Sequence, residues 1–256
     1  MKNQLFIIMC VVFSFVPIFS LYAQGDMQQH NTIVLVDGSS YMKTNWGGSS
    51  KLTVFRNALS DTLAELNKSP AWGFNMGIRV YGDKSARSIK DCLDARQGSK
   101  LDWFEPVVIR SVVEGISPKG MACLAFGMGT TREDFPVSGK NTQNYLVCIV
   151  SARDECSKDE KETIEWLTKD KGLAATYIIG LDVPASQCEY LSGIFKTVAG
   201  RFINITSPSQ LTGTMNLVLN QYCRGQTEPA SIDAGVGSSS EPKTAPGLTP
   251  KPVEIK

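Results

Sequence analysis

The chain has 256 residues, and its 26 basic and 25 acidic side chains leave a formal net charge of +1. This near balance, without a cluster of Lys and Arg, argues against a nucleic-acid partner. The sequence holds one histidine, His30, in a short leader before the first predicted strand. We therefore expect neither a histidine-dependent catalytic triad nor a histidine metal cluster.

The N-terminus is typical of an exported protein. Lys2 precedes an uncharged apolar run over residues 5–22, and Ala23 offers a small residue at a cleavage site. We interpret residues 1–23 as a cleaved signal peptide. The alternative is a retained anchor helix, because the run approaches the length that a bilayer needs. We expect a periplasmic, cell-surface or secreted protein with no membrane span after cleavage.

Strand-like and helix-like segments alternate after a leader at residues 24–30. The predicted strands are 32–36, 74–81, 145–151, 174–183 and 202–205, and the predicted helices are 51–68, 107–116, 157–172, 187–199 and 208–222. Residues 83–102 are predicted to be an irregular connection, and Ser157 is the candidate cap of its helix. This alternation predicts one α/β domain over residues 31–223, a doubly wound and mostly parallel sheet flanked by helices. Residues 224–256 are rich in Pro, Ser and Gly and are predicted to be a disordered tail.

The first predicted strand ends in polar side chains. An apolar run from Ile33 to Val36 leads directly into Asp37 and Ser39. In a parallel sheet such residues lie at the carboxyl edge, where ligands bind. Their oxygens suit a hard cation such as Mg²⁺. The structural alternative is that Asp37 caps loop amides or pairs with an arginine.

The segment Asp37-Gly38-Ser39-Ser40-Tyr41 resembles the Asp-x-Ser-x-Ser motif of von Willebrand factor type A (VWA) domains. Further segments are similar, in order, to a bacterial exported branch of that family: Arg79–Gly82 with Cys92-Leu93-Asp94, Ser117–Ala125, Leu146–Cys156, Ile178–Leu181 and Val198–Phe202. The resemblance covers residues 31–222. It implies a Rossmann-like VWA fold and a module that binds another protein.

The resemblance also implies a degenerate metal-ion-dependent adhesion site. The family site takes five protein groups from three loops, of which Asp37 and Ser39 are present. Tyr41 stands at the third position, and Ala122 and Ala152 stand where the family has a threonine and an aspartate. We therefore predict binding without a cofactor. The alternative is a Mg²⁺-dependent or other divalent-cation-dependent adhesion domain that uses Asp37, Ser39 and Asp154.

The predicted contact surface comprises Tyr41, Met42, Trp46 and Arg153, facing another protein or surface macromolecule. The sequence leaves two alternatives open for the position of the Arg153 side chain. Its guanidinium either fills the vacated cation position beside Asp37, or it points into solvent or pairs with a neighbouring carboxylate. Catalysis is the least favoured function, because Ser39 lacks the Gly-x-Ser-x-Gly setting of a nucleophile.

Six cysteines remain after the predicted cleavage. Their even number favours disulfides in an exported protein. Cys156 and Cys188 follow two successive predicted strands, so we predict a bridge between them. Cys148 lies within an apolar strand and is predicted to be a buried free thiol.

Overall fold

The computed structural model describes residues 28–69, 73–156 and 159–224. The predicted signal peptide, most of the predicted leader, Ser157 and all but the first residue of the predicted tail lie outside the described residues. Among the residues described, no helix combines the length and the apolar character needed to cross a membrane.

The domain is built on one six-stranded sheet in the order β5-β4-β1-β6-β7-β8. The strands are β1 (Gln29–Asp37), β4 (Phe74–Tyr81), β5 (Ala95–Trp103), β6 (Thr142–Val150), β7 (Leu173–Leu181) and β8 (Gly200–Ile205). All neighbours pair in parallel except β4 and β5. A two-stranded ribbon, β2 (Asn45–Trp46) with β3 (Ser49–Ser50), leads into the first long helix.

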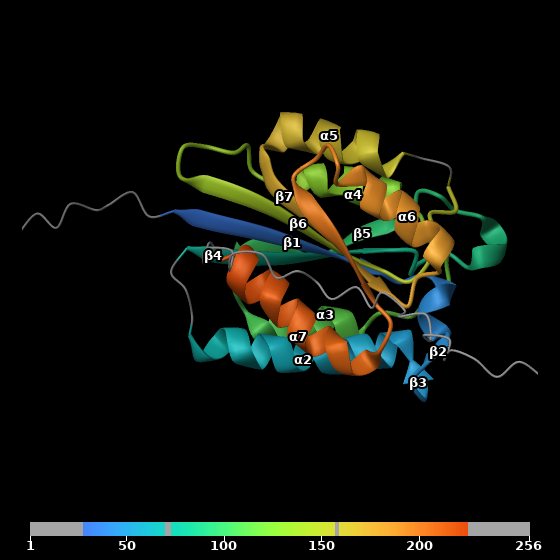
Figure 1. The fold of residues 1–256 in the computed structure, drawn as a ribbon. Helices are drawn as coiled ribbons and strands as arrows, with labels where there is room; N and C mark the ends of the chain where they lie inside the picture. The colour runs from blue at the N-terminus through green and yellow to red at the C-terminus, as the bar shows by residue number, and fades with distance from the viewer. Residues whose placement is uncertain (1–27, 70–72, 157–158, 225–256) are drawn as a thin grey trace, which may run out of the picture. The chain divides into compact units, whose positions relative to one another are not determined.

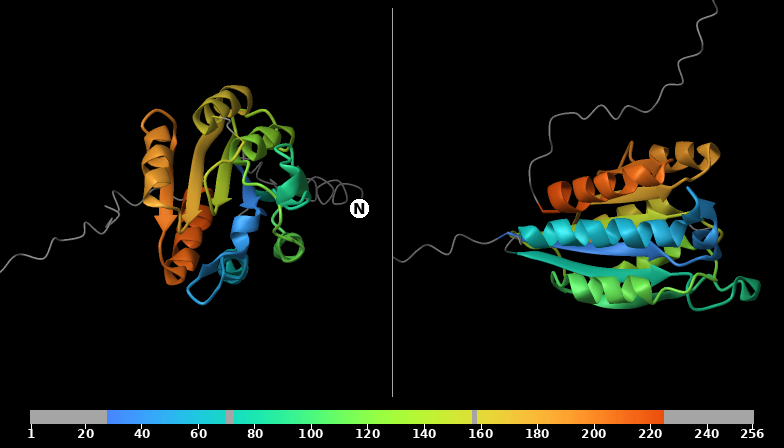
Figure 2. Two further views of the ribbon diagram at one scale, coloured as in Figure 1. Left: turned by 90° about the vertical axis from the view of Figure 1, so that its right-hand side faces the viewer. Right: turned by 90° about the horizontal axis from the view of Figure 1, so that it is seen from below.

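Helices cover both faces of the sheet (Figure 1 and Figure 2). One face carries α2 (Lys51–Lys68), α3 (Pro106–Glu114) and α7 (Leu211–Asn216), and the other carries α4 (Leu124–Thr130), α5 (Glu160–Lys171) and α6 (Ala185–Ile194). Short helical turns complete the chain at η2 (Ser40–Lys43), η3 (Arg87–Ile89), η4 (Thr131–Glu133), η5 (Pro208–Gln210) and η6 (Leu217–Tyr222). The prediction of a doubly wound, mostly parallel sheet is confirmed.

The apolar run of β1 explains its central place. Val34 and Val36 belong to the core beneath α2, whereas Ile33 and Leu35 belong to the core beneath α4 and α5. Because successive side chains point to opposite faces, a strand covered on both sides carries apolar residues in succession, as β1 does from Ile33 to Val36. The same strand then places Asp37 at the carboxyl edge.

Besides the short β2–β3 ribbon and several helical turns, two larger elements, β5 and α4, were not predicted. The prediction of an irregular connection over residues 83–102 is wrong from Ala95 onward, where β5 begins. β5 lies at the edge of the sheet, where its residues are exposed or half-buried, so it lacks the apolar run that marks an inner strand. α4 is short and contains Gly127, where a Cβ would lie 3.2 Å from ring atoms of Tyr81. The cap of α5 is Asp159, whose carboxylate accepts the Glu162 amide, and not the predicted Ser157.

Candidate functional site

The loops at the carboxyl edge of β1 are joined by backbone hydrogen bonds. The Ser40 amide donates to the Gly120 carbonyl at 3.0 Å, and the Glu155 amide donates to the Ala122 carbonyl at 2.8 Å. Gly82 has a φ of 73°, and a Cβ there would lie 2.4 Å from the Met121 carbonyl oxygen. Only glycine fits this close approach, so the loops after β1 and β4 and before α4 form one closely packed edge.

Asp37 is fully buried, and protein groups already hold both of its carboxylate oxygens. Oδ1 accepts the Ser39 amide at 2.7 Å, while Oδ2 accepts the Ser151 amide at 3.1 Å and also the Ser151 hydroxyl. Burial raises the pKa of Asp37, and the contacts with Ser151 and Ser39 partly offset that rise. The predicted capping role of this carboxylate is therefore present.

Lys51 brings a positive charge to the same edge. Its side chain is buried, and Nζ donates to the carbonyl oxygens of Ser151 at 3.1 Å and Asp182 at 3.3 Å. Burial lowers the pKa of Lys51, whereas the carboxylates of Asp182 and Asp37 act to raise it. The chain thus places a buried ammonium group at the same edge as Asp37, and the sequence analysis did not identify it. Its position at the first residue of α2 was visible in the sequence, but its burial was not.

Few oxygens at this edge are free to bind a cation. The buried hydroxyl of Ser39 has no hydrogen-bond partner among the described residues, so it is available. Ala122 and Ala152 offer no side-chain oxygen, and both oxygens of Asp37 accept hydrogen bonds. Divalent cations such as Mg²⁺ and Ca²⁺ require about six oxygen ligands, including carboxylates. Among the described residues, Asp37, Ser39 and Asp154 are therefore fewer oxygen donors than such a cation requires.

Asp154, the replacement ligand named from the sequence, is held by backbone amides. Its Oδ2 accepts the Ala125 amide at 2.9 Å, and its Oδ1 accepts the Cys156 amide at 2.7 Å. The carboxylate thereby fixes the loop after β6 to the first turn of α4. Binding a cation would compete with at least one of these two hydrogen bonds.

Tyr41 is hydrogen-bonded to the ion pair between Arg87 and Glu155. Its hydroxyl donates to Glu155 Oε1 at 3.3 Å and accepts from Arg87 Nη2 at 3.1 Å. Arg87 stacks over the Tyr41 ring at 4.7 Å and also pairs with Glu155 through both nitrogens. This Tyr41–Arg87–Glu155 cluster joins the loop after β4 to the loop after β6, and no sequence pattern indicated it.

Two of the four residues predicted to form the contact surface are buried. Met42 is 0% exposed in the core under α2, and Trp46 is 5% exposed, with Nε1 donating to the Thr206 carbonyl at 3.3 Å. Their exposure was wrongly predicted, because apolar side chains in the loop after β1 turn inward to cover α2 and the end of the sheet. Tyr41 is half-buried and Arg153 is exposed.

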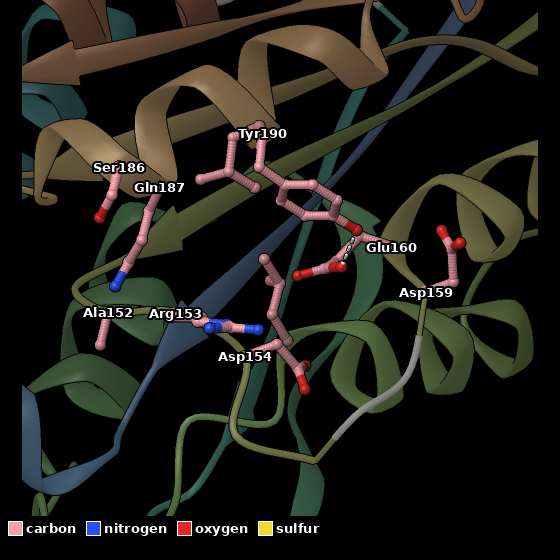
Figure 3. Close-up of a pocket in the computed structure, with 10 residues that line it drawn as sticks. Ala152, Arg153, Asp154, Asp159, Glu160, Ser186, Gln187 and Tyr190 are labelled. Atoms are coloured by element: carbon pink, nitrogen blue, oxygen red, sulfur yellow. Dashed lines mark hydrogen bonds between the residues drawn. The ribbon is translucent and has the colours of Figure 1, made fainter.

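Arg153 does not fill a position beside Asp37. In the described residues it forms no ion pair, and it lines two adjacent pockets of about 600 and 590 Å³. The first pocket, between α5 and α6, also contains Asp154, Glu160 and Tyr190 (Figure 3). There the Tyr190 hydroxyl donates to Glu160 Oε2 at 2.7 Å, and burial raises the pKa of Glu160.

The predicted bridge between Cys156 and Cys188 is wrong. Cys156 lies in disulfide contact with Cys92 and with Cys123, whereas Cys188 donates its thiol to the Val183 carbonyl at 3.4 Å. Hydrogen bonds of Glu155 to Arg87 and to the Ala122 amide hold the loop after β6 against the segments that carry Cys92 and Cys123, whereas Cys188 lies within α6. Cys148 is a buried free thiol, as predicted, and burial raises its pKa.

No model of a known protein family matches the sequence, and no curated protein matches it either. Solved structures do match over about three quarters of the chain. The proximal thread matrix protein 1 of the mussel byssus aligns with a TM-score of 0.57 at 16% identity, covering 77% of this chain and 47% of that one. The described domain thus corresponds to about half of that protein.

Two further structures show the same arrangement. The pilus adhesin SpaC from Lactobacillus rhamnosus GG has a TM-score of 0.60 at 11% identity, covering 77% of this chain and 31% of that one. The SpRpn10 VWA domain has a TM-score of 0.53 at 17% identity, covering 78% of this chain and 98% of that one. The chain therefore has the VWA fold, a six-stranded and mostly parallel sheet with flanking helices.

Proposed function

We propose that this chain is an exported VWA-like module that binds another protein or surface macromolecule through the carboxyl edge of its sheet, without a bound cation. It would act in the periplasm, at the cell surface or after secretion. Structures of similar fold include a pilus adhesin and the PilB minor pilin of Streptococcus sanguinis, which supports a binding role. Catalysis is not proposed.

The main support for this proposal is the set of hydrogen bonds that the Asp37 carboxylate accepts. In a cation-dependent site a carboxylate at this place needs the metal to compensate its buried charge. Here the Ser39 and Ser151 groups hold both oxygens, and the ammonium of Lys51 lies close enough to affect the charge balance. Asp37 thus has a structural role that is complete without a metal. Ala122 and Ala152 fit the same interpretation of a degenerate adhesion site.

Arg153 is the residue that we propose to contact the partner. It lies next to the vacated aspartate position, is exposed, and borders both pockets. A guanidinium can hold a carboxylate through two parallel hydrogen bonds, so it can receive an acidic side chain without an intervening metal. We therefore propose that the partner presents an acidic group to the edge beside Ala152.

Calorimetric titration of the purified chain with Mg²⁺, Mn²⁺ and Ca²⁺ tests the absence of a cation. We expect no saturable heat for any of the three. Saturable binding that disappears in an Asp37→Asn variant would overturn the proposal of cation-independent binding.

Chemical crosslinking to intact source cells, with and without chelator, tests the partner and the contact residue. We expect the same crosslinked product in both conditions, and a loss of about tenfold or more for Arg153→Glu, as for an interface anchor. Arg110→Glu, an equal charge change at an exposed position of α3, is the control and should leave the product unchanged. A product that needs divalent cations would contradict the proposal.

A cation-dependent adhesion domain remains the second candidate because of one observation. The buried hydroxyl of Ser39 has no partner among the described residues, as expected for a ligand awaiting a metal. Asp37 and Asp154 would complete the set, each by giving up a hydrogen bond. One structure of the mussel protein has a zinc-occupied metal-ion-dependent adhesion site. The calorimetric titration above separates this candidate from the first.

A further inference from the structure

Three cysteines from three separate loops meet at the carboxyl edge of the sheet. Cys92 follows β4, Cys123 precedes α4, and Cys156 follows β6, and their sulfur atoms all lie within 4.8 Å of one another. Cys156 is in disulfide contact with both of the others. Since a sulfur atom forms one disulfide bond at a time, one cysteine of the three must be left as a thiol next to that bond.

One backbone arrangement accommodates either pairing. The Cα atoms of Cys92 and Cys156 are 5.6 Å apart, and those of Cys123 and Cys156 are 5.3 Å apart. Both separations fall in the range usual for disulfides, about 4.4–6.8 Å. The loops are also held without a disulfide, because Glu155 pairs with Arg87 and hydrogen-bonds to Ala122. Exchange between the two pairings therefore needs little movement of the chain.

The two pairings differ in where they leave the thiol. Cys123 is only 1% exposed, so a thiol there is shielded from solvent, whereas Cys92 is half-buried and lies in a surface loop. The other cysteines do not enter this exchange in the described domain: Cys148 and Cys223 are fully buried in the two cores, and Cys188 bonds to the Val183 carbonyl.

We propose that Cys92, Cys123 and Cys156 form a thiol–disulfide exchange site that moves a thiol between a buried and an accessible position. The Cys123 thiolate attacks Sγ of Cys156, forming one disulfide while the Cys92–Cys156 bond breaks and its electron pair leaves on the Cys92 sulfur. The proton lost by Cys123 goes to water, and no oxidant is consumed. The freed Cys92 thiolate can then attack a disulfide of a small molecule or a partner, forming a mixed disulfide and releasing one thiolate.

The alternative to disulfide exchange is a metal site formed by the same three sulfur atoms. Three thiolates could hold a soft cation such as Zn²⁺. The contact of Cys156 with both partners favours covalent pairing, and an exported chain meets an oxidising compartment. The inference does not depend on the partner or on the contact role of Arg153.

Peptide mapping of the full chain, purified without reductant and alkylated at low pH, tests the exchange. We expect two disulfide-linked peptide pairs in one preparation, Cys92–Cys156 and Cys123–Cys156. Incubation with oxidised glutathione should then place glutathione on Cys92. A Cys188→Ser background removes the other half-buried thiol from the measurement.

The Cys123→Ser variant is decisive, because it leaves Cys92 and Cys156 bonded with no neighbouring thiol to release Cys92. We expect glutathione incorporation at Cys92 to fall by about tenfold or more, since attack then requires an external thiol. Cys148→Ser, at a buried thiol outside the cluster, should leave the rate unchanged. A single pairing in every sample, an equal rate in Cys123→Ser, or one zinc ion per chain with all three cysteines reduced would overturn the proposal.

Discussion

At the scale of single residues, the carboxyl edge of the sheet contains buried charged side chains, each hydrogen-bonded to other groups of the chain. Asp37, Lys51 and Glu160 are all buried, and each has polar or charged partners from a different segment of the chain. A buried charge is costly unless it is paired and hydrogen-bonded. Substitutions at these positions should therefore lower the free energy of unfolding more than the same substitutions at exposed positions.

Asp37→Asn should destabilise the domain by about 1–3 kcal/mol, because an amide offers one acceptor oxygen where the carboxylate offers two. One of the Ser39 or Ser151 donors would lose its acceptor, and Lys51 would lose a nearby negative charge. Urea unfolding measures the difference. Asp61→Asn, at an exposed position of α2, is the control, and an equal effect of the two substitutions would contradict the buried role of Asp37.

Glu160→Gln should alter the pH dependence of stability. Burial raises the pKa of Glu160, so the folded state binds its proton more tightly than the unfolded state does. The stability linked to this proton is fully present below the ordinary glutamate pKa and is lost as the pH rises through the raised value. The free energy of unfolding of the wild type should therefore fall, relative to the variant, across that window.

Urea unfolding of the wild type and Glu160→Gln over a pH series measures this effect. Glu162→Gln, two residues along α5 at an exposed position, should follow the wild type at every pH. A difference between the wild type and Glu160→Gln that stays constant with pH would contradict the assignment.

At the scale of elements, the register of the central strands is marked by three asparagines. Asn31 of β1 faces Asn75 of β4 and Asn144 of β6 in the same row of the sheet. Asn31 donates to Asn144 at 3.0 Å and accepts from Asn75 at 2.9 Å, and Asn144 donates onward to the Pro136 and Lys171 carbonyls. A shift by one residue would break this amide row and turn the apolar side chains to the wrong faces.

Asn31→Leu should destabilise the domain by about 1–3 kcal/mol for each buried group that it leaves unpaired. Asn75 loses an acceptor and Asn144 loses a donor, while the new side chain cannot replace either. Thermal unfolding followed by circular dichroism measures the loss. Asn57→Leu, on the exposed side of α2, makes the same chemical change without a buried partner, and a comparable loss there would argue against the amide row.

The edge strand β5 shows why some elements could not be predicted. Inner strands carry apolar side chains at most positions because helices cover both of their faces, and 74–81 was predicted with its observed bounds. β5 has one neighbour and mostly exposed or half-buried residues, so its sequence resembles a loop. Its pairing with β4 depends on that neighbour, which local sequence does not reveal.

At the scale of the whole molecule, stability should be independent of divalent cations. A ligand that binds only the folded state stabilises it in proportion to the logarithm of its concentration over its Kd. Because we propose that Ala122 and Ala152 stand at vacated ligand positions, we expect the same Tm in excess Mg²⁺ and in chelator. Differential scanning calorimetry checks this, and a Tm that rises steadily with Mg²⁺ concentration would support the cation-dependent alternative.

The sequence by itself determined the fold class, because apolar runs and helical periodicity indicate which faces of the strands and helices are covered. It also carried the proposal that metal ligands are replaced, since the identities of Ala122 and Ala152 are read directly from it. Tertiary structure alone decided that Met42 and Trp46 turn inward, that Lys51 lies near Asp37, and that Cys156 meets Cys92 and Cys123 rather than Cys188. Burial, charge compensation and disulfide pairing depend on distances between loops that are far apart in the chain. Local sequence patterns do not reveal those distances.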